Sequence, residues 1–422
     1  MRVMVVSRLF SGFSDSLATG TWRPKGQPAI YKLLEALADA PDIDLISVFG
    51  CKDEPAGQRF AGRRWANVDR LGVCAILPYR RRPGLAATGL DTAWREFTHA
   101  ARCLWLYLRH RPDVIYFTSA NFAIAALFAR LGLGRVILRF MGMFPAEQAL
   151  ALSRGGFVRW LYAAPFDHVV CTQEGSGAEW YLPRLLRPSA PLSILLNGVD
   201  QDGPSPEQVE TLRARLGPNR RPTILFVGRL ETMKGCVEFL DAALLVLRDR
   251  PDAAQFVIAG SGSLKDTLLQ SLQDAGRPSD IHLLDGLPHD AMPAVYAACD
   301  IYVSLNKHGN LSNANLEALA AGKCMVVLEG DPAAHIDQIT ESLLPRDCAK
   351  RVSRADIARS LADTLIALLD RPEQVAAHAA AARRLADKIL IGWDERVGQE
   401  ISIIRGSFNT KAPCTSSASV LA

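Results

Sequence analysis

The fold of this chain can be argued from one stretch of its sequence, Phe226-Val227-Gly228-Arg229-Leu230-Glu231-Thr232-Met233-Lys234-Gly235. The apolar residues that lead into it begin at Thr223 and are typical of a buried strand. Gly228 and Arg229 then form a turn, and Lys234 and Gly235 open a segment with helical periodicity. A strand that passes through a short turn into a helix is the repeating unit of a parallel α/β sheet.

The same stretch places two cations beside the start of a helix. The first turn of a helix has backbone N–H groups without partners and carries a partial positive charge, which suits an anion. Arg229 offers two parallel donors and Lys234 a compact charge, and Gly228 precedes both in the turn. These residues are candidates for binding a diphosphate. The alternative is that both cations are solvated loop residues.

Strand and helix signals alternate on both sides of this stretch. After it, we expect strands at 255–259, 281–284, 301–305 and 324–328, with helices at 236–248, 290–298 and 315–321. Before it, we expect strands at 2–7, 43–49, 73–77, 114–117, 135–140, 168–172 and 192–196, helices at 29–40 and 91–109, and a polar loop at 11–16. Two consecutive βα series predict an α/β protein with two Rossmann-like, doubly wound parallel-sheet domains.

Composition places the boundary between the two series. The segment 201–221 is polar and rich in proline, so we interpret it as a linker or hinge. The first domain then spans 1–200 and the second 222–385. A final helix is expected over 386–405, and the tail 406–422 is expected to be disordered.

A second group of candidate residues follows the expected strand 301–305. Gly309-Asn310-Leu311-Ser312 is a small, polar loop that leads into an apolar helix. The backbone at the start of that helix can present N–H groups to phosphate, from Asn313, Ala314, Asn315 and Leu316. Glu317 can accept hydrogen bonds from the two hydroxyls of a ribose. The alternative for Glu317 is a carboxylate that only stabilises the first turn of the helix.

Together these groups resemble the donor site of the retaining GT-B glycosyltransferases, specifically the large family 4 group (glycosyl transferases group 1). That family has a V-G-R-x-x-x-x-K-G segment and an E-A-x-A-x-G segment, which stand here at 227–235 and 317–322. Shorter matches lie at 257–262, 296–300 and 197–200, and at Trp393 with Glu395 and Arg396. The resemblance covers nearly the whole chain and is specific in its second half.

The resemblance implies a fold and an activity. The two domains would face a cleft, and the 386–405 helix would cross back to the first domain. The enzyme would move a sugar from a nucleotide-diphosphate donor to a glycan or glycolipid acceptor with retention, in bacterial surface polysaccharide assembly. Arg229 and Lys234 would be catalytic, and Gly228, the segment 313–317 and Gly12 of the first domain would bind the donor. No metal ion is expected, and no cofactor, since the sugar nucleotide is a substrate.

One departure from the family pattern lies eight residues before Glu317. The family has a glutamate there that contacts the donor sugar, and this chain has Gly309. This departure leaves open a non-catalytic homologue, and a sugar-nucleotide epimerase on the same fold is a second alternative. The absence of a G-x-G-x-x-G after the first strand argues against a dehydrogenase.

The first domain offers few candidates for chemistry. No catalytic base is assigned to it, and the histidines are interpreted as surface or capping residues, namely His99, His110, His168 and, in the second domain, His289. Within the expected helix 91–109, apolar residues share one face: Trp94, Phe97, Ala101, Leu104 and Leu108.

Charge is unevenly distributed. The first 200 residues contain 24 Lys and Arg and 16 Asp and Glu, a net charge of +8, whereas the whole chain carries +4. A basic first half suits an anionic acceptor or an anionic membrane, although its densest point, Arg80-Arg81-Arg82, also fits a solvated loop. No transmembrane helix, signal peptide or C-x-x-C pair is recognised. We expect a cytoplasmic protein without a nucleic-acid partner, and peripheral contact with the inner membrane is a hypothesis.

Overall fold

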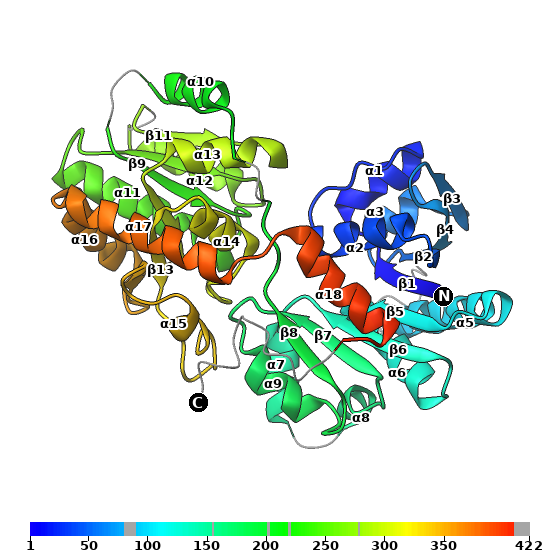
Figure 1. The fold of residues 1–422 in the computed structure, drawn as a ribbon. Helices are drawn as coiled ribbons and strands as arrows, with labels where there is room; N and C mark the ends of the chain where they lie inside the picture. The colour runs from blue at the N-terminus through cyan, green and yellow to red at the C-terminus, as the bar shows by residue number, and fades with distance from the viewer. Residues whose placement is uncertain (80–89, 154–155, 201–202, 218–220, 277–278, 409–422) are drawn as a thin grey trace. The chain divides into compact units, whose positions relative to one another are not determined.

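The computed structural model describes residues 1–79, 90–153, 156–200, 203–217, 221–276 and 279–408 (Figure 1). The chain divides into two compact units. The first contains Met1–Thr172, Ala178–Leu195 and the chain from Trp393 onward, and the second contains Gln173–Gly177 and Leu196–Gly392. Each unit has its own sheet and its own hydrophobic core.

The first unit is built on a sheet of eight strands within the described residues, in the order β3-β4-β2-β1-β5-β6-β7-β8. All neighbours are parallel except β3, which runs antiparallel to β4. The strands are β1 (Arg2–Arg8), β2 (Asp44–Gly50), β3 (Trp65–Val68), β4 (Gly72–Leu77), β5 (Val114–Thr118), β6 (Arg135–Phe140), β7 (His168–Thr172) and β8 (Leu192–Leu195). The sequence predicts every strand except β3.

Helices connect these strands. They are α1 (Ser11–Thr19), α2 (Pro28–Asp39), α3 (Glu54–Arg59), α5 (Leu90–His110), α6 (Phe122–Arg130), α7 (Pro145–Leu152), α8 (Phe157–Tyr162), α9 (Ala178–Leu185) and α18 (Trp393–Arg405), with a 3-10 turn η1 (Ser119–Asn121). Apolar side chains of β1 and β5, such as Val6 and Phe117, pack with those of α6, such as Phe128, in the core.

Residues 11–16 form a helix where the sequence predicts a loop. α1 spans Ser11–Thr19 and ends at Gly20, which has a φ of 79°. Phe13 and Leu17 lie one helical turn apart and are both buried. Burial of this apolar pair stabilises the helix. The Gly and Ser residues of the segment led to the prediction of a loop instead.

The second unit is built on a parallel sheet of six strands within the described residues, in the order β11-β10-β9-β12-β13-β14. The strands are β9 (Thr223–Val227), β10 (Gln255–Ala259), β11 (Ile281–Leu284), β12 (Ile301–Ser304), β13 (Cys324–Leu328) and β14 (Ala349–Val352). Alternate residues of one strand enter different cores, as Ile224 and Leu225 of β9 do. The sheet is therefore covered on both faces, and the predicted doubly wound α/β architecture is confirmed for this unit as for the first.

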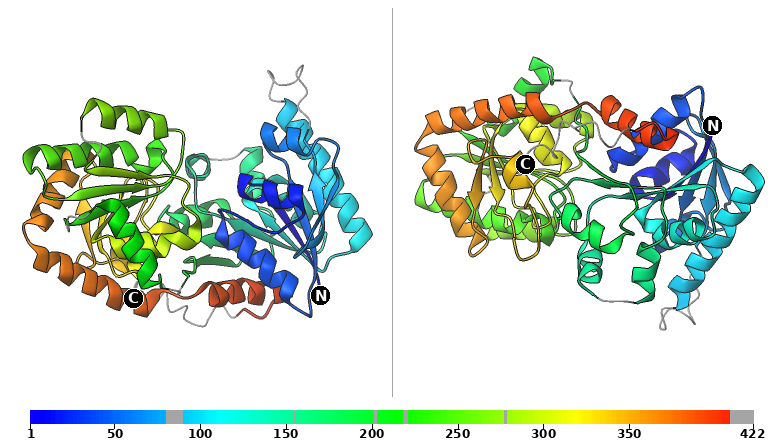
Figure 2. Two further views of the ribbon diagram at one scale, coloured as in Figure 1. Left: turned by 90° about the horizontal axis from the view of Figure 1, so that it is seen from above. Right: turned by 60° about the horizontal axis from the view of Figure 1, so that its bottom comes forward.

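The helices of the second unit are α10 (Pro206–Leu216), α11 (Cys236–Asp249), α12 (Lys265–Asp274), α13 (Met292–Ala298), α14 (Asn313–Ala320), α15 (Thr340–Leu343), α16 (Ile357–Leu369) and α17 (Pro372–Ile389), with 3-10 turns η2 (Thr232–Lys234) and η3 (His289–Ala291). Helix α16 packs beside α11, and α17 packs beside α16 (Figures 1 and 2).

The predicted linker 201–221 is largely a helix of the second unit, α10. Ser205 caps this helix: its hydroxyl accepts from the N–H of Gln208 at 3.2 Å, and the Gln208 side chain accepts from the N–H of Ser205 at 3.0 Å. Pro206 stands in the first turn, where its missing N–H has no consequence. The proline that suggested a break therefore starts a helix. Residues 201–202 and 218–220 lie outside the described residues.

The end of the chain also differs from the predicted helix 386–405. α17 continues to Ile389, and a new helix, α18, begins at Trp393 and belongs to the first unit. The predicted tail 406–422 is described only to Phe408, whose ring lies 6.4 Å from that of His168. The disorder predicted for 409–422 falls outside the described residues.

Among the described residues, no helix combines the length and apolar character needed to cross a membrane.

Candidate functional site

The two predicted groups of the second unit meet at the carboxyl end of its sheet. β9 and β12 are neighbours although β10 and β11 separate them in the chain. At such a switch point the connections leave in opposite directions and leave room for a ligand. Gly228 follows β9 directly and the segment 305–312 follows β12, so both groups lie at this edge.

Gly235 holds the two groups in contact. It has a φ of 77° at the start of α11, and a Cβ there would stand less than 3.0 Å from the Cβ and the carbonyl oxygen of Leu305. The N–H of Lys307 donates to the carbonyl oxygen of Met233 at 3.0 Å. The Lys234 turn therefore packs backbone to backbone against the loop that follows β12.

Gly228 packs against the turn that follows β10. Its N–H donates to the carbonyl oxygen of Ala259 at 3.1 Å. A Cβ on Gly260 would stand less than 3.0 Å from the carbonyl oxygen of Gly228. The glycine after β10 therefore permits a close approach that fixes the turn carrying Arg229.

The two predicted cations have different surroundings. Arg229 has a side chain that is 70% exposed, with Nη1 2.9 Å from Oε1 of Glu231. Lys234 is half-buried, and this burial lowers the pKa of its ammonium; Glu174 opposes the shift and Arg229 adds to it. An incoming anion would favour the charged ammonium and so offset both its burial and the repulsion from Arg229, which suits this pair to a phosphate group.

Two open amides lie at the start of α14. The N–H groups of Asn315 and Leu316 donate to the carbonyl oxygen of Ser312, at 2.9 and 3.0 Å. In the described part of the chain, the N–H groups of Asn313 and Ala314 have no hydrogen-bond acceptor. Of the four predicted backbone donors, these two can bind phosphate without breaking a bond.

The side chain of Asn315 holds the loop in shape. Its Nδ2 donates to the carbonyl oxygen of Asn310 at 3.0 Å, and its Oδ1 accepts from Tyr302 and Ser312, both at 2.9 Å. Asn310 in turn donates through N and Nδ2 to the buried carboxylate of Asp337, at 2.7 and 2.8 Å. Burial raises the pKa of Asp337 to about 6. This polar scaffold positions the first turn of α14.

Glu317 lies on α14 one turn further on. Its Oε2 is 3.0 Å from the hydroxyl of Tyr296, and its Oε1 is 4.0 Å from Nε2 of His289. Burial raises its pKa, and His289 opposes that rise. The same nitrogen of His289 lies 3.2 Å from Oδ2 of Asp200. A half-buried carboxylate with one oxygen toward an exposed imidazole can accept hydrogen bonds from a diol.

Gly309 stands where backbone segments meet. It has a φ of 138°, and a Cβ there would stand less than 3.0 Å from the carbonyl oxygen of Glu174 and the Cα of Gly175. The N–H of Leu311 donates to that same oxygen of Glu174 at 3.1 Å. The segment Gln173–Gly177 thus occupies the space into which a side chain at 309 would project.

The remaining predicted donor residue, Gly12, belongs to the first unit. Its carbonyl oxygen accepts from the N–H of Lys25 at 3.1 Å, and a Cβ there would stand less than 3.0 Å from the carbonyl oxygen of Lys25. Packing against Lys25 is therefore sufficient to require glycine at this position.

Two histidines expected at the surface of the first unit are buried. His99 is 1% exposed and His168 is 8% exposed. A polar partner offsets the burial of each: Nε2 of His99 lies 3.2 Å from the carbonyl oxygen of Pro78, and that of His168 lies 2.8 Å from Oγ of Ser193.

Four residues near the site are not among those assigned from the sequence: Tyr296, Asp200, His289 and Glu174. The sequence carries a signal for Tyr296 and Asp200, since both fall in segments that match the family pattern. The sequence carries no such signal for His289 or Glu174, because the residues next to them in the site are distant in the chain.

Comparison with known proteins identifies the family of this chain. A sequence profile of the family described as glycosyl transferases group 1 matches residues 208–384. A 2-deoxystreptamine N-acetyl-D-glucosaminyltransferase of Streptomyces fradiae is 26% identical over 78% of this chain and 80% of its own length. A GDP-mannose-dependent alpha-(1-6)-phosphatidylinositol monomannoside mannosyltransferase of Mycobacterium tuberculosis is 30% identical over 71% of this chain and 78% of its own.

Solved structures agree in fold. Anabaena HepE, crystallised with UDP, superposes with a TM-score of 0.68 at 16% identity, covering 96% of this chain and all of the other. WaaG, a glycosyltransferase involved in lipopolysaccharide biosynthesis, superposes with a TM-score of 0.61 at 13% identity, covering 95% of this chain. The strand orders, the site at the β9/β12 switch point and these relatives together show that the chain belongs to the group 1 glycosyltransferases, enzymes of the GT-B fold.

Proposed function

We propose that this enzyme transfers a sugar from a nucleotide-diphosphate donor to a glycan or lipid-linked acceptor, with retention of anomeric configuration. One observation carries the proposal. The Lys234 ammonium and Arg229 guanidinium lie at the same edge of the sheet as the open amides of Asn313 and Ala314. Glu317 follows on the same helix and suits the ribose of the nucleotide.

The arrangement matches the charge that develops during transfer. As the bond between the anomeric carbon and the diphosphate oxygen breaks, negative charge grows on the leaving group. Preorganised cations and N–H groups stabilise that charge where it appears. We propose that Arg229 and Lys234 perform this role without a metal ion, so the activity should survive a chelator.

Two relatives are named for different acceptors. The Streptomyces fradiae enzyme is named for 2-deoxystreptamine, and the Mycobacterium tuberculosis enzyme is named for phosphatidylinositol monomannoside and an alpha-(1-6) linkage. For this chain we propose an acceptor of bacterial surface polysaccharide or glycolipid assembly, and peripheral contact with an anionic membrane, which the net charge of +8 over the first 200 residues favours.

NMR analysis of the product from a donor of known anomeric configuration tests whether transfer retains that configuration.

A thermal-shift screen tests donor binding. The ligands are UDP, GDP, ADP and their common sugar conjugates, because a ligand that binds only the folded state raises the unfolding midpoint. Arg229→Ala should abolish the shift. Arg248→Ala is a matched control, since Arg248 is 63% exposed and also lies 2.9 Å from a carboxylate, that of Asp249.

Two results would contradict the proposal. One is the absence of a shift with every nucleotide, and the other is an equal shift in the Arg229→Ala and Arg248→Ala variants. Conversion of the donor into an epimer without acceptor would favour an epimerase instead.

A further inference from the structure

The long helix α5 of the first unit exposes its large apolar side chains. Its large apolar side chains are between 37% and 65% exposed: Leu90, Trp94, Phe97, Leu104, Trp105 and Leu108. Their spacing of three or four residues, completed by the exposed Ala101, places them in one stripe along the helix. A helix of a soluble domain normally packs such a face against the core.

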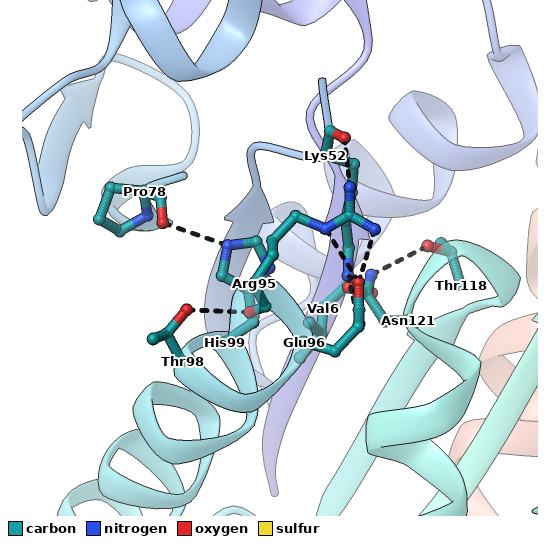
Figure 3. A network of polar contacts seen from close by, with 9 residues as sticks. All are labelled: Val6, Lys52, Pro78, Arg95, Glu96, Thr98, His99, Thr118 and Asn121. Atoms are coloured by element: carbon teal, nitrogen blue, oxygen red, sulfur yellow. Dashed lines mark hydrogen bonds and ion pairs between the residues drawn. The ribbon is translucent and has the colours of Figure 1, made fainter. Parts of the chain in front are cut away.

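The opposite face of α5 carries polar groups that point toward the sheet (Figure 3). Nζ of Lys52, which follows β2, lies 2.8 Å from both carboxylate oxygens of Glu96. Nη2 of Arg95 lies 2.9 Å from Oε1 of the same carboxylate, and the buried His99 lies one turn further on. These ion pairs and the burial of Cys103 fix the rotation of the helix, so the apolar stripe cannot turn inward.

The charged groups beside the stripe are arginines. The Arg102 guanidinium lies 4.1 Å from the ring centre of Trp105 and 5.1 Å from that of Trp65, which is 39% exposed on β3. The Arg109 guanidinium lies 5.8 Å from the ring centre of Trp105. Burial lowers the pKa of Arg102, and the nearby charge of Arg64 lowers it further.

The exposed residues of α5 include no acidic side chain. Its two carboxylates face inward: Asp91 is buried and bonded to Tyr79, and Glu96 is paired with Lys52 and Arg95. Tryptophan and arginine beside aliphatic side chains are typical of surfaces that lie at the headgroup level of a bilayer.

We propose that this stripe, with Trp65 and the arginines beside it, binds the surface of an anionic lipid bilayer with α5 lying in the plane of the interface. The helix has 21 residues, so the stripe is about 30 Å long. Its apolar side chains enter between the headgroups while the guanidinium groups pair with lipid phosphates. The inference rests on the proposed membrane contact and names the surface that makes it.

A second copy of the chain is the other occupant that such a face could take. A twofold interface places the same surface on both sides. The arginines Arg64, Arg102 and Arg109 of both copies would then lie in one interface, and α5 offers no exposed carboxylate to offset their charge. Anionic headgroups offset that charge, so they are the better partner.

Vesicle flotation tests the inference. The protein should float with vesicles made of equal parts phosphatidylcholine and phosphatidylglycerol, and stay in solution with phosphatidylcholine alone. Phe97→Glu and Leu108→Glu should each weaken vesicle binding about tenfold or more, because each removes an apolar side chain from the interface. Leu269→Glu is the matched control, since Leu269 is 37% exposed on α12 of the second unit. Unchanged unfolding midpoints would show that the variants are folded.

Three results would overturn the inference. They are the absence of flotation with the anionic vesicles, equal flotation of the α5 variants and the wild type, and a wild-type dimer that the α5 substitutions dissociate. The nucleotide thermal shift, measured on the same variants, reports on the second unit. It would persist if only the membrane surface were wrong, and it would be absent if the proposed transfer were wrong.

Discussion

The carbonyl oxygen of Glu174 stands less than 3.0 Å from the point where a Cβ at position 309 would lie, so Gly309 is required by the fold. The segment after β7 has taken the space of a side chain at 309 and is bonded to the same loop through Leu311. The loop that precedes α14 is thus held by backbone contact. The glycine at this position is a structural feature of the loop between β12 and α14.

Gly309→Ala should therefore destabilise the protein. The variant combines a left-handed backbone with overpacking against Glu174 and Gly175, and we expect a loss of about 3 kcal/mol in the free energy of unfolding. Gly286→Ala is the control, because Gly286 has a φ of 67° but nothing within 4 Å of its would-be Cβ, and it should lose only about 1 kcal/mol. Urea denaturation of both variants measures the difference. Equal losses of unfolding free energy in the two variants would show that Glu174 and Gly175 do not crowd a Cβ at position 309.

Glu317→Gln should weaken nucleotide binding roughly 10- to 100-fold, the effect of removing hydrogen bonds to a charged group. Tyr296→Phe should weaken it only a few-fold, since it removes one neutral donor 3.0 Å from the carboxylate. Isothermal titration calorimetry with the nucleotide found in the thermal-shift screen measures the loss of affinity in both variants. If Glu317→Gln bound as tightly as the wild type, the carboxylate would have no role in holding the ribose.

His99 should make stability depend on pH. Burial lowers its pKa from 6.5 to about 4, Lys52 and Arg95 add to the shift, and Glu96 opposes it. The folded protein therefore holds the neutral imidazole while the unfolded chain takes up a proton. About 3 kcal/mol of stability, present above pH 6.5, should be lost as the pH falls to about 4.

The His99→Gln variant isolates this effect. Glutamine can still donate to the carbonyl oxygen of Pro78 but does not titrate. Its unfolding free energy should fall less steeply than that of the wild type between pH 6.5 and about 4. Parallel curves for the two proteins would show that folding does not lower the pKa of His99.

Glu400 on α18 should be a strong determinant of the first unit's stability. Its Oε1 lies 3.1 Å from Nε of Arg139 and 2.7 Å from Nη2 of Arg396, and all three side chains are at most 2% exposed. Burial would raise the pKa of Glu400, but Arg139 and Arg396 outweigh it, so the pKa is lowered. Glu400→Gln removes the carboxylate charge that these two buried guanidinium groups share and should cost about 3 kcal/mol.

A surface pair of the same helix is the control. Arg405 lies 2.7 Å from Oδ1 of the exposed Asp42, and Asp42→Asn should leave the unfolding free energy nearly unchanged. Thermal or urea unfolding compares the two variants. A small effect of Glu400→Gln would mean that the arginines find other partners.

The fold and the location of the site could be predicted from local features. Strands such as 223–227 carry a continuous apolar run, and each passes through a turn into a helix, so parallel sheets follow from chain order alone. Arg229 and Lys234 come directly after such a strand, which places them at its carboxyl end. The confirmed elements are those whose periodicity is uninterrupted.

The segments whose predicted secondary structure was wrong share one cause: the conformation that a residue adopts depends on its neighbours in space. Pro206 looks like a break until Ser205 and Gln208 form a capping box around it. Likewise, the segment 11–16 looks like a loop until Phe13 and Leu17 are seen to be buried.

By itself, the sequence determined the two doubly wound sheets and the cations of the proposed donor site, because strand periodicity and turn chemistry act over a few residues. Only the tertiary structure decided that Glu174 excludes a side chain at 309 and that the apolar face of α5 points outward. Both depend on contacts between residues far apart in the chain, Glu174 with Gly309 and Lys52 with Glu96, and no local pattern encodes them.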